Sequence, residues 1–80
     1  MDFKNLIYLC DNKRHLICYP YSIENLHLMA IDLKINKCWF HNNRNPHYDV
    51  PKKRINEIQS KCKLIKTREI ILIIKGSKII

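Results

Sequence analysis

The chain has 80 residues and a formal net charge of +8, with 46% hydrophobic and 28% charged residues. A chain of this length supports one modest hydrophobic core, and its apolar and charged fractions argue against disorder. We therefore expect a single domain over residues 1–80. The only glycine is Gly76, which excludes a glycine-rich phosphate loop and a dinucleotide-binding fingerprint.

The positive charge is spread along the chain, and one of its densest runs is Lys52, Lys53 and Arg54. A lysine-rich surface keeps a protein in solution, and the same charge also suits a polyanionic partner such as a nucleotide, a nucleic acid or an acidic protein. Composition leaves both interpretations open. We take these three residues as a candidate basic face.

The cysteine spacing, the N-terminal residues and the longest apolar run indicate in which cellular compartment the protein is expected. The four cysteines show no CxxC spacing, and the N-terminal residues lack the basic and apolar regions of a signal peptide. Reduced, mostly buried thiols and a cytoplasmic location are therefore expected. The apolar run of residues 70–74 is too short to span a bilayer, so no membrane partner is expected.

The N-terminal third predicts a hairpin followed by a helix. Residues 5–10 and 15–19 are β-branched and aromatic runs, and the short gap between them contains the turn formers Asp11 and Asn12. Ser22 is a candidate N-cap, and apolar residues at helical spacing predict a helix over residues 23–35.

The rest of the chain alternates between strand and helix signals. Residues 38–40 predict a short buried strand, reached by a helical crossover and therefore parallel to the second strand. Residues 41–49 are polar and predict a loop. Asp49, with Pro51 two residues on, is typical of the start of a second helix. Residues 63–66 predict a minimal strand. For residues 70–74 we favour a helix capped by Thr67, although the run of five aliphatic residues also suits a strand.

This order predicts an α/β protein with a small open sheet of three to four strands, partly parallel, with an N-terminal hairpin and two or three helices. Ligands gather beyond the carboxyl ends of parallel strands in such sheets. Ser22 follows one predicted end, and the loop of residues 41–49 follows the neighbouring one. We therefore expect a binding site on this rim.

The loop is rich in residue types that carry chemistry. His41, His47, Tyr48 and Asp49 lie within nine positions, and His15 could approach from the second strand. Imidazoles exchange protons near neutral pH, and a carboxylate can orient one of them. This pattern indicates phosphoryl chemistry with His41, His47 and Asp49 as catalytic groups.

Simple anion binding is an equal interpretation of the same loop. Arg44 would add charge there, and the free N–H groups at the helix that starts near Ser22 would face the anion. A divalent metal ion is a further alternative, with His41, His47 and Asp49 as three ligands around an open position. Their spacing matches no specific metal motif, so we assign no metal ligand from the sequence.

Structural roles compete with each functional interpretation. Asp49 would serve equally as a helix cap, and the Tyr48 ring would cover the edge of the core. His27 lies four residues from Ile23 and from Ile31 on the first helix, a pattern typical of a core histidine. A catalytic cysteine is not expected, because every cysteine lies within or at the end of an apolar segment.

Several short motifs follow one another along almost the whole chain: Asp11, His15 with Leu16, Glu24 with Leu26 and His27, Trp39 with Phe40 and His41, residues 46–50, Lys53 with Arg54, and Arg68 with Glu69. Their order resembles the bacterial and phage family called domain of unknown function 4031. The family has no established activity, so the resemblance implies a fold and a site, and it adds His15 and His27 to that site. It also implies a bacterial or phage protein, with the host cytoplasm as its location.

The chain departs from the family pattern at three places. The family carries an acidic residue after the second strand, where this chain has residues 19–21, and it carries glycines near Lys34 and near residues 61–62. The lost acidic group favours binding over catalysis.

Three functional hypotheses follow. The first is a protein that binds a phosphate-bearing ligand, a nucleotide or a nucleic acid, through His15, Ser22, His27, His41, Arg44, His47, Tyr48 and Asp49. The second is a phosphoesterase or nuclease that uses the same histidines, with or without a metal ion. The third is a phage-encoded interaction protein that inhibits a bacterial host protein through the basic face. A homodimer would enlarge the thin core in each case.

Overall fold

The computed structural model describes residues 6–76, and its first element is the predicted N-terminal hairpin. Strands β1 (Ile7–Cys10) and β2 (His15–Tyr19) pair antiparallel. The turn between them is closed by the Asp11 side chain, which accepts hydrogen bonds from the backbone N–H groups of Lys13 and His15. Asn5 of the predicted first strand lies outside the described residues.

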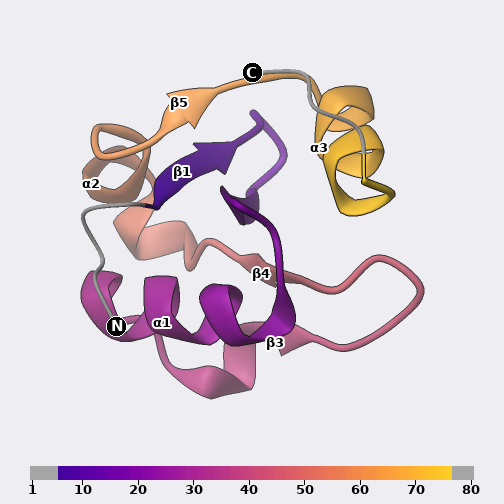
Figure 1. Ribbon diagram of the computed structural model, residues 1–80. Helices are drawn as coiled ribbons and strands as arrows, with labels where there is room; N and C mark the ends of the chain where they lie inside the picture. Colours follow the sequence, from indigo (N-terminus) through magenta and orange to yellow (C-terminus); the bar gives the residue numbers. More distant parts are fainter. Residues whose placement is uncertain (1–5, 77–80) are drawn as a thin grey trace.

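Over residues 6–76 the sheet has five strands in the order β3-β4-β2-β1-β5. The three further strands are β3 (Phe40–His41), β4 (His47–Asp49) and β5 (Lys63–Leu64). The pair formed by β1 and β5 is parallel, and the other pairs are antiparallel. The predicted α/β class, open mixed sheet and N-terminal hairpin are confirmed, with slightly more strands than predicted (Figure 1).

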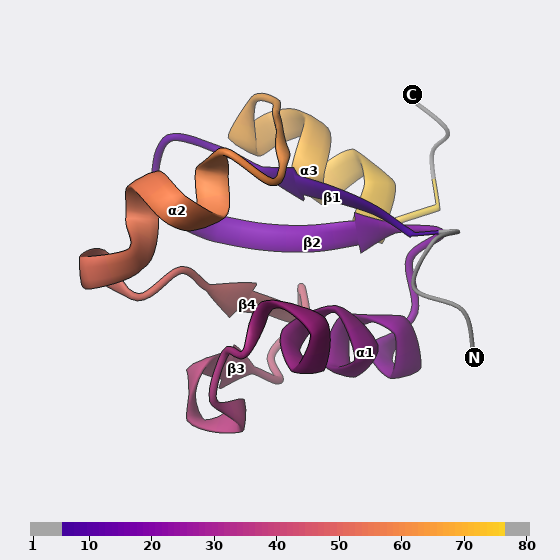
Figure 2. The same cartoon turned by 90° about the vertical axis from the view of Figure 1, so that its left-hand side faces the viewer.

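Helices cover both faces of this sheet. They are α1 (Ile23–Leu33), α2 (Ile55–Gln59) and α3 (Thr67–Ile74). Figure 2 shows α1 and α3 on opposite sides of β1 and β2. The Ser22 hydroxyl accepts the N–H of Asn25, as expected of an N-cap, and the aliphatic run of residues 70–74 is helical.

Alternation along the strands decides which side chains face which helix. Leu16 and Tyr48 are cross-strand partners, and the Tyr48 hydroxyl lies 2.8 Å from Nδ1 of His27 on α1. Both side chains therefore point to the α1 side, where the core includes Leu26 and Met29. The neighbouring positions, His15 and Ile17, point to the opposite side, which α3 covers.

The middle of the chain differs from the prediction. Cys38 is exposed and belongs to the short 3₁₀ helix Lys37–Trp39, so the predicted strand over residues 38–40 is wrong except at Phe40. The strand that follows pairs antiparallel with β4 at the edge of the sheet, and not parallel with β2. The crossover rule fails here because α1 is followed by an edge hairpin, with a loop of residues 42–46.

Asp49 does not start a helix. It ends β4, opposite His15, and Pro51 instead precedes the 3₁₀ helix Lys52–Arg54 that leads into α2. Pairing with β2 therefore places Asp49 in the sheet, although the local sequence is typical of a helix cap. Over residues 6–76, none of the helices combines the length and apolar character that crossing a membrane requires.

Candidate functional site

Strand register brings four polar residues to the α3 side of the sheet. His15 lies opposite Asp49, and His41 lies opposite His47. Opposed residues of antiparallel strands point to the same face, as do residues two apart on one strand. The centroid of the His47 ring lies 5.1 Å from that of the His15 ring and 5.2 Å from that of the His41 ring. We call His15, His41, His47 and Asp49 the histidine cluster.

A buried carboxylate supports one side of this cluster. Asp11 is 1% exposed, and its Oδ2 lies 2.7 Å from Nδ1 of His15 and accepts the hydroxyl of Thr67 at the start of α3. Burial alone raises the pKa of Asp11, but the hydrogen bonds from Thr67, His15 and two backbone N–H groups outweigh it and leave the pKa below its ordinary value. Asp11 is therefore an ionised acceptor, and Nδ1 of His15 carries a proton.

The other side of the cluster is held by the backbone and by His41. Nδ1 of His47 lies 2.7 Å from the carbonyl oxygen of Asn45, so this nitrogen also carries a proton. Nε2 of His41 lies 2.9 Å from Oδ2 of Asp49, and Nε2 of His47 lies 3.3 Å from Oδ1 of the same carboxylate. In His15 and in His47, Nε2 is therefore the ring nitrogen that neither Asp11 nor the carbonyl of Asn45 engages.

Three of these side chains could hold a metal ion. Ligand atoms of His15, His47 and Asp49 all lie within 4.8 Å of one another. The sequence analysis considered His41, His47 and Asp49 as the three ligands, whereas the structure has His15 in place of His41. The pairing of β2 with β4 brings His15 there, and the sequence of the loop does not reveal that pairing.

A small hollow adjoins the cluster. It has a volume of about 130 Å³, and one wall comes from α3 and the other from the loop of residues 42–46. The lining includes His15 and His47, the side chains of Asn43 and Asn45, and the aliphatic residues Ile70, Ile71 and Ile74. Such a mixed apolar and amide lining suits a small organic group beside a polar centre.

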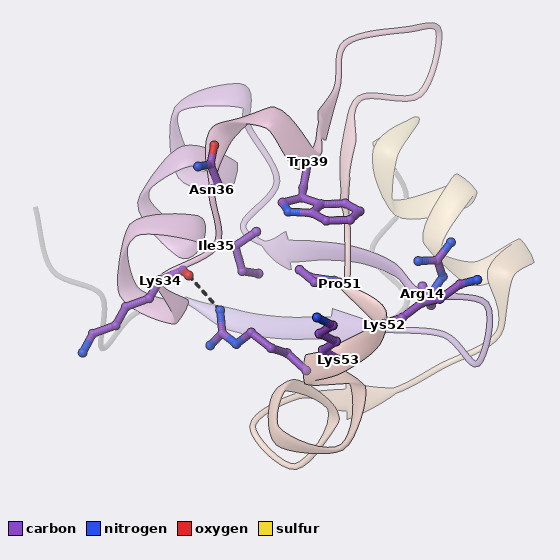
Figure 3. A pocket seen from close by; sticks show the side chains of 9 residues that line it. Arg14, Lys34, Ile35, Asn36, Trp39, Pro51, Lys52 and Lys53 are labelled. Atoms are coloured by element: carbon purple, nitrogen blue, oxygen red, sulfur yellow. Dashed lines mark hydrogen bonds between the residues drawn. The ribbon is translucent and has the colours of Figure 1, made fainter.

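A second, larger depression lies elsewhere on the molecule and is lined mainly by basic residues (Figure 3). Its volume is about 650 Å³, and no acidic residue is among those that line it. We call it the basic groove, and its lining residues are Arg14, Lys34, Ile35, Asn36, Trp39, Pro51, Lys52, Lys53 and Arg54.

The structure separates the remaining predicted site residues from the cluster. Ser22 lies beyond the far end of β2 from His15 and caps α1. His27 and Tyr48 bond to each other on the α1 side of the sheet. Arg44 is exposed in the loop of residues 42–46.

All three residues of the predicted basic face line the groove, but Arg54 is also engaged in the fold. Arg54 donates to the carbonyl oxygens of Leu33 and Lys34 at the end of α1 and pairs with Glu57. Its charge is thus partly neutralised, whereas Lys52 and Lys53 are exposed.

Sequence reasoning missed Asp11 and Thr67 as parts of the site. Asp11 was interpreted as a turn former, and it does close the turn. Thr67 was interpreted as the cap of the last helix, whereas the N-cap of α3 is Lys66. A signal for the first was present, because a carboxylate four residues before a histidine across a tight turn can reach its ring. Thr67 lies 56 residues from Asp11, so no local pattern connects them.

Comparison of the chain with protein-family models, with curated proteins and with solved structures gives no match. The geometry of the histidine cluster and of the basic groove is therefore the basis for a functional proposal.

Proposed function

We propose that the protein binds a phosphate-bearing molecule, a nucleotide or a nucleic acid, at the histidine cluster. The observation that carries the proposal is the convergence of His15, His41 and His47 from three strands onto one face, beside a hollow lined by amides and aliphatic side chains. The cluster would take the phosphate, and the hollow would take part of the organic group.

The basic groove supports a polyanionic ligand. Lys52 and Lys53 lie on it beside the half-buried indole of Trp39, and Arg14 immediately precedes His15 in the chain. Lysines that neutralise backbone phosphates and an aromatic ring that stacks on a base are the usual elements of single-strand binding. These features favour an oligonucleotide over a free mononucleotide.

Titration calorimetry and thermal shift with mono-, di- and cyclic nucleotides and with short single-stranded DNA and RNA test this proposal. We expect binding that His15→Ala and His47→Ala abolish. The absence of heat and of a thermal shift with all of these ligands, with and without an added divalent ion, would contradict it.

For an oligonucleotide, the joint variant Lys52→Ala and Lys53→Ala should bind more weakly and depend less on salt. Loss of two phosphate contacts lowers the slope of log affinity against log salt by about 1.4 to 1.8. The matched control, Lys63→Ala with Lys75→Ala, removes the same charge from exposed residues outside the groove. Equal slopes for the two double variants would show that the groove contributes only net charge.

Hydrolysis of a phosphoester is the second candidate, and the orientation of the imidazoles favours it. His15 and His47 each have Nδ1 fixed by an acceptor, so Nε2 is the atom that would exchange a proton with a substrate. An activated phosphodiester such as bis(p-nitrophenyl) phosphate should then be turned over with a bell-shaped pH profile. His47→Ala should lower turnover by about 10²- to 10⁴-fold. Turnover that persists in this variant and in His41→Ala would rule hydrolysis by the cluster out.

A further inference from the structure

We propose that His15, His47 and Asp49 bind one divalent transition-metal ion, and that this ion supplies the positive charge with which the site holds phosphate. The binding of the metal is inferred from geometry alone, and its role toward phosphate rests on the function proposed above.

The ring nitrogens of His15 and His47 that the fold leaves available set the place of the ion. Nδ1 of His15 is bonded to Asp11, and Nδ1 of His47 to the carbonyl of Asn45, which leaves the Nε2 atoms as the available metal ligands. The ligand atoms of these two histidines and Asp49 lie within 4.8 Å of one another. Zinc bonds of about 2.1 Å place two ligands of one ion no more than about 4.2 Å apart, so small side-chain rotations would close the set.

The groups behind the two histidines are those that support metal ligands in other proteins. Histidines that bind metals almost always donate their other ring N–H to a carboxylate or a backbone carbonyl, which fixes the ring and raises the basicity of the bound nitrogen. Asp11 performs this role for His15, and the carbonyl of Asn45 performs it for His47. Asp11 is itself held by Thr67 and by two backbone N–H groups of the turn, so the His15 ring is oriented before any ion binds.

His47 and Asp49 already have the spacing of two ligands of one ion. Nε2 of His47 lies 3.3 Å from Oδ1 of Asp49, within the separation of about 4.2 Å that two zinc ligands can have.

The charge of the cluster points the same way. Asp11 and Asp49 bring two carboxylates to the place where the phosphate would bind. A divalent ion offsets both carboxylates and leaves open coordination positions for phosphate oxygens. Two imidazoles and one carboxylate suit zinc, cobalt, iron or manganese, and do not suit magnesium, which prefers oxygen ligands.

His41 supports the site without completing it. Its Nε2 is engaged by Oδ2 of Asp49 at 2.9 Å, which leaves Oδ1 toward His47. The same histidine is stacked on the His47 ring at an interplanar angle of 13°. We therefore treat His41 as a positioning residue for Asp49.

The test uses the full chain after removal of metal with a chelator, with Co²⁺ alone as the probe because it reports its ligands by visible absorption. One equivalent of Co²⁺ should give a spectrum with imidazole and carboxylate ligation, and Zn²⁺ should displace it. His15→Ala, His47→Ala and Asp49→Ala should each weaken binding by more than about 100-fold, beyond the losses measured for outer-shell groups.

Two controls keep the result interpretable. His27→Gln removes a histidine on the other face of the sheet, and Cys38→Ala removes the exposed thiol; both should bind Co²⁺ as the parent does. If circular dichroism shows that His47→Ala does not fold, His47→Gln is used in its place, because it nearly keeps the side-chain volume. Binding that survives the cluster variants, or no binding of Co²⁺ or Zn²⁺ at all, would overturn the metal site.

The metal site and the proposed function fail in different ways. If the chelated protein binds an oligonucleotide as tightly as the metal-loaded protein, the function stands and the role of the ion toward phosphate is overturned. If Co²⁺ binds at the cluster but neither inorganic phosphate nor any nucleotide changes its spectrum or adds heat, the metal site stands, whereas its role toward phosphate and the proposed function fall.

Discussion

Asp11→Ala should lower the free energy of unfolding of the metal-free protein by about 3 kcal/mol at pH 7. A buried hydrogen-bonding group left without its partner costs about 1–3 kcal/mol, and we take about 3 kcal/mol for the whole change because His15 is 34% exposed and can regain water. The variant also leaves the Thr67 hydroxyl and two backbone N–H groups without their acceptor. Since small domains have about 5–15 kcal/mol in total, this is a large fraction of their stability.

Urea unfolding followed by circular dichroism measures this loss. A loss below about 1 kcal/mol would show that the four hydrogen bonds to Asp11 contribute little to the fold. The matched variant Asp11→Asn keeps the shape and leaves Oδ1 able to accept the two N–H groups of the turn, so it should be closer to the parent in stability.

Asp11→Asn should nevertheless impair the metal site. Its amide donates where the carboxylate accepted, so His15 must accept at Nδ1 and move its proton to Nε2, the atom that would bind the metal. We expect Co²⁺ affinity to fall by about 10- to 100-fold, although the fold persists. Unchanged affinity in this variant would show that Asp11 serves the turn alone.

The depressed pKa of Asp11 also sets a direction for the pH dependence. A carboxyl group with a folded-state pKa below its unfolded value of about 3.9 stabilises the fold fully above that value, and this stabilisation is lost as the pH falls through the folded-state pKa. The stability difference between the parent and Asp11→Ala should therefore shrink in acid. A difference that is constant from pH 7 to pH 2 would contradict the ionised role of Asp11.

Local sequence patterns were sufficient to predict an element where the residues that determine it lie within the element or next to it. The strand His15–Tyr19 has its predicted bounds, and Ser22 caps α1, because alternation, turn formers and a capping hydroxyl all act within a few residues. The helical state of residues 70–74 was harder to predict, because five consecutive aliphatic residues fit the periodicity of a strand as well as that of a helix. The structure has a helix there, which buries Ile70 and Ile73 against the sheet.

Elements of two or three residues could not be predicted in the same way. The edge strands β3 and β4 exist because they pair with each other and with β2, and a two-residue strand has no period of its own. Asp49 illustrates the consequence. Its local sequence is typical of a helix start, whereas the pairing with His15 puts it in the sheet.

The structure brings only some of the predicted site residues together. His41, His47 and Asp49 do lie together, but the reason is antiparallel register and not the rim of a parallel sheet. The expected position beside Ser22 followed from the wrong strand direction. The family resemblance placed His27 in the site, and the structure places it on the other face, bonded to Tyr48.

Tyr48→Ala should be the most destabilising single change in the part of the sheet that carries the cluster, with a loss of about 3–5 kcal/mol. Tyr48 is 1% exposed, and its ring packs 5.2 Å from the Phe40 ring and 5.9 Å from the His27 ring, measured between centroids. Truncation leaves a cavity between α1 and β4, and it would loosen the strand that holds His47 and Asp49. Thermal and urea unfolding measure the loss, and a change below about 1 kcal/mol would show that the surrounding side chains refill the space.

Tyr48→Phe separates this structural role from ligand binding. The variant keeps the ring and removes only the hydroxyl that lies 2.8 Å from Nδ1 of His27, at a cost of about 1 kcal/mol. Because that hydroxyl points to the α1 side of the sheet, the affinities for Co²⁺ and for an oligonucleotide should stay within about twofold of the parent, well under 1 kcal/mol. A tenfold loss of either affinity would show instead that Tyr48 acts on the ligand, and that the two faces of β4 are coupled more tightly than their separate contacts imply.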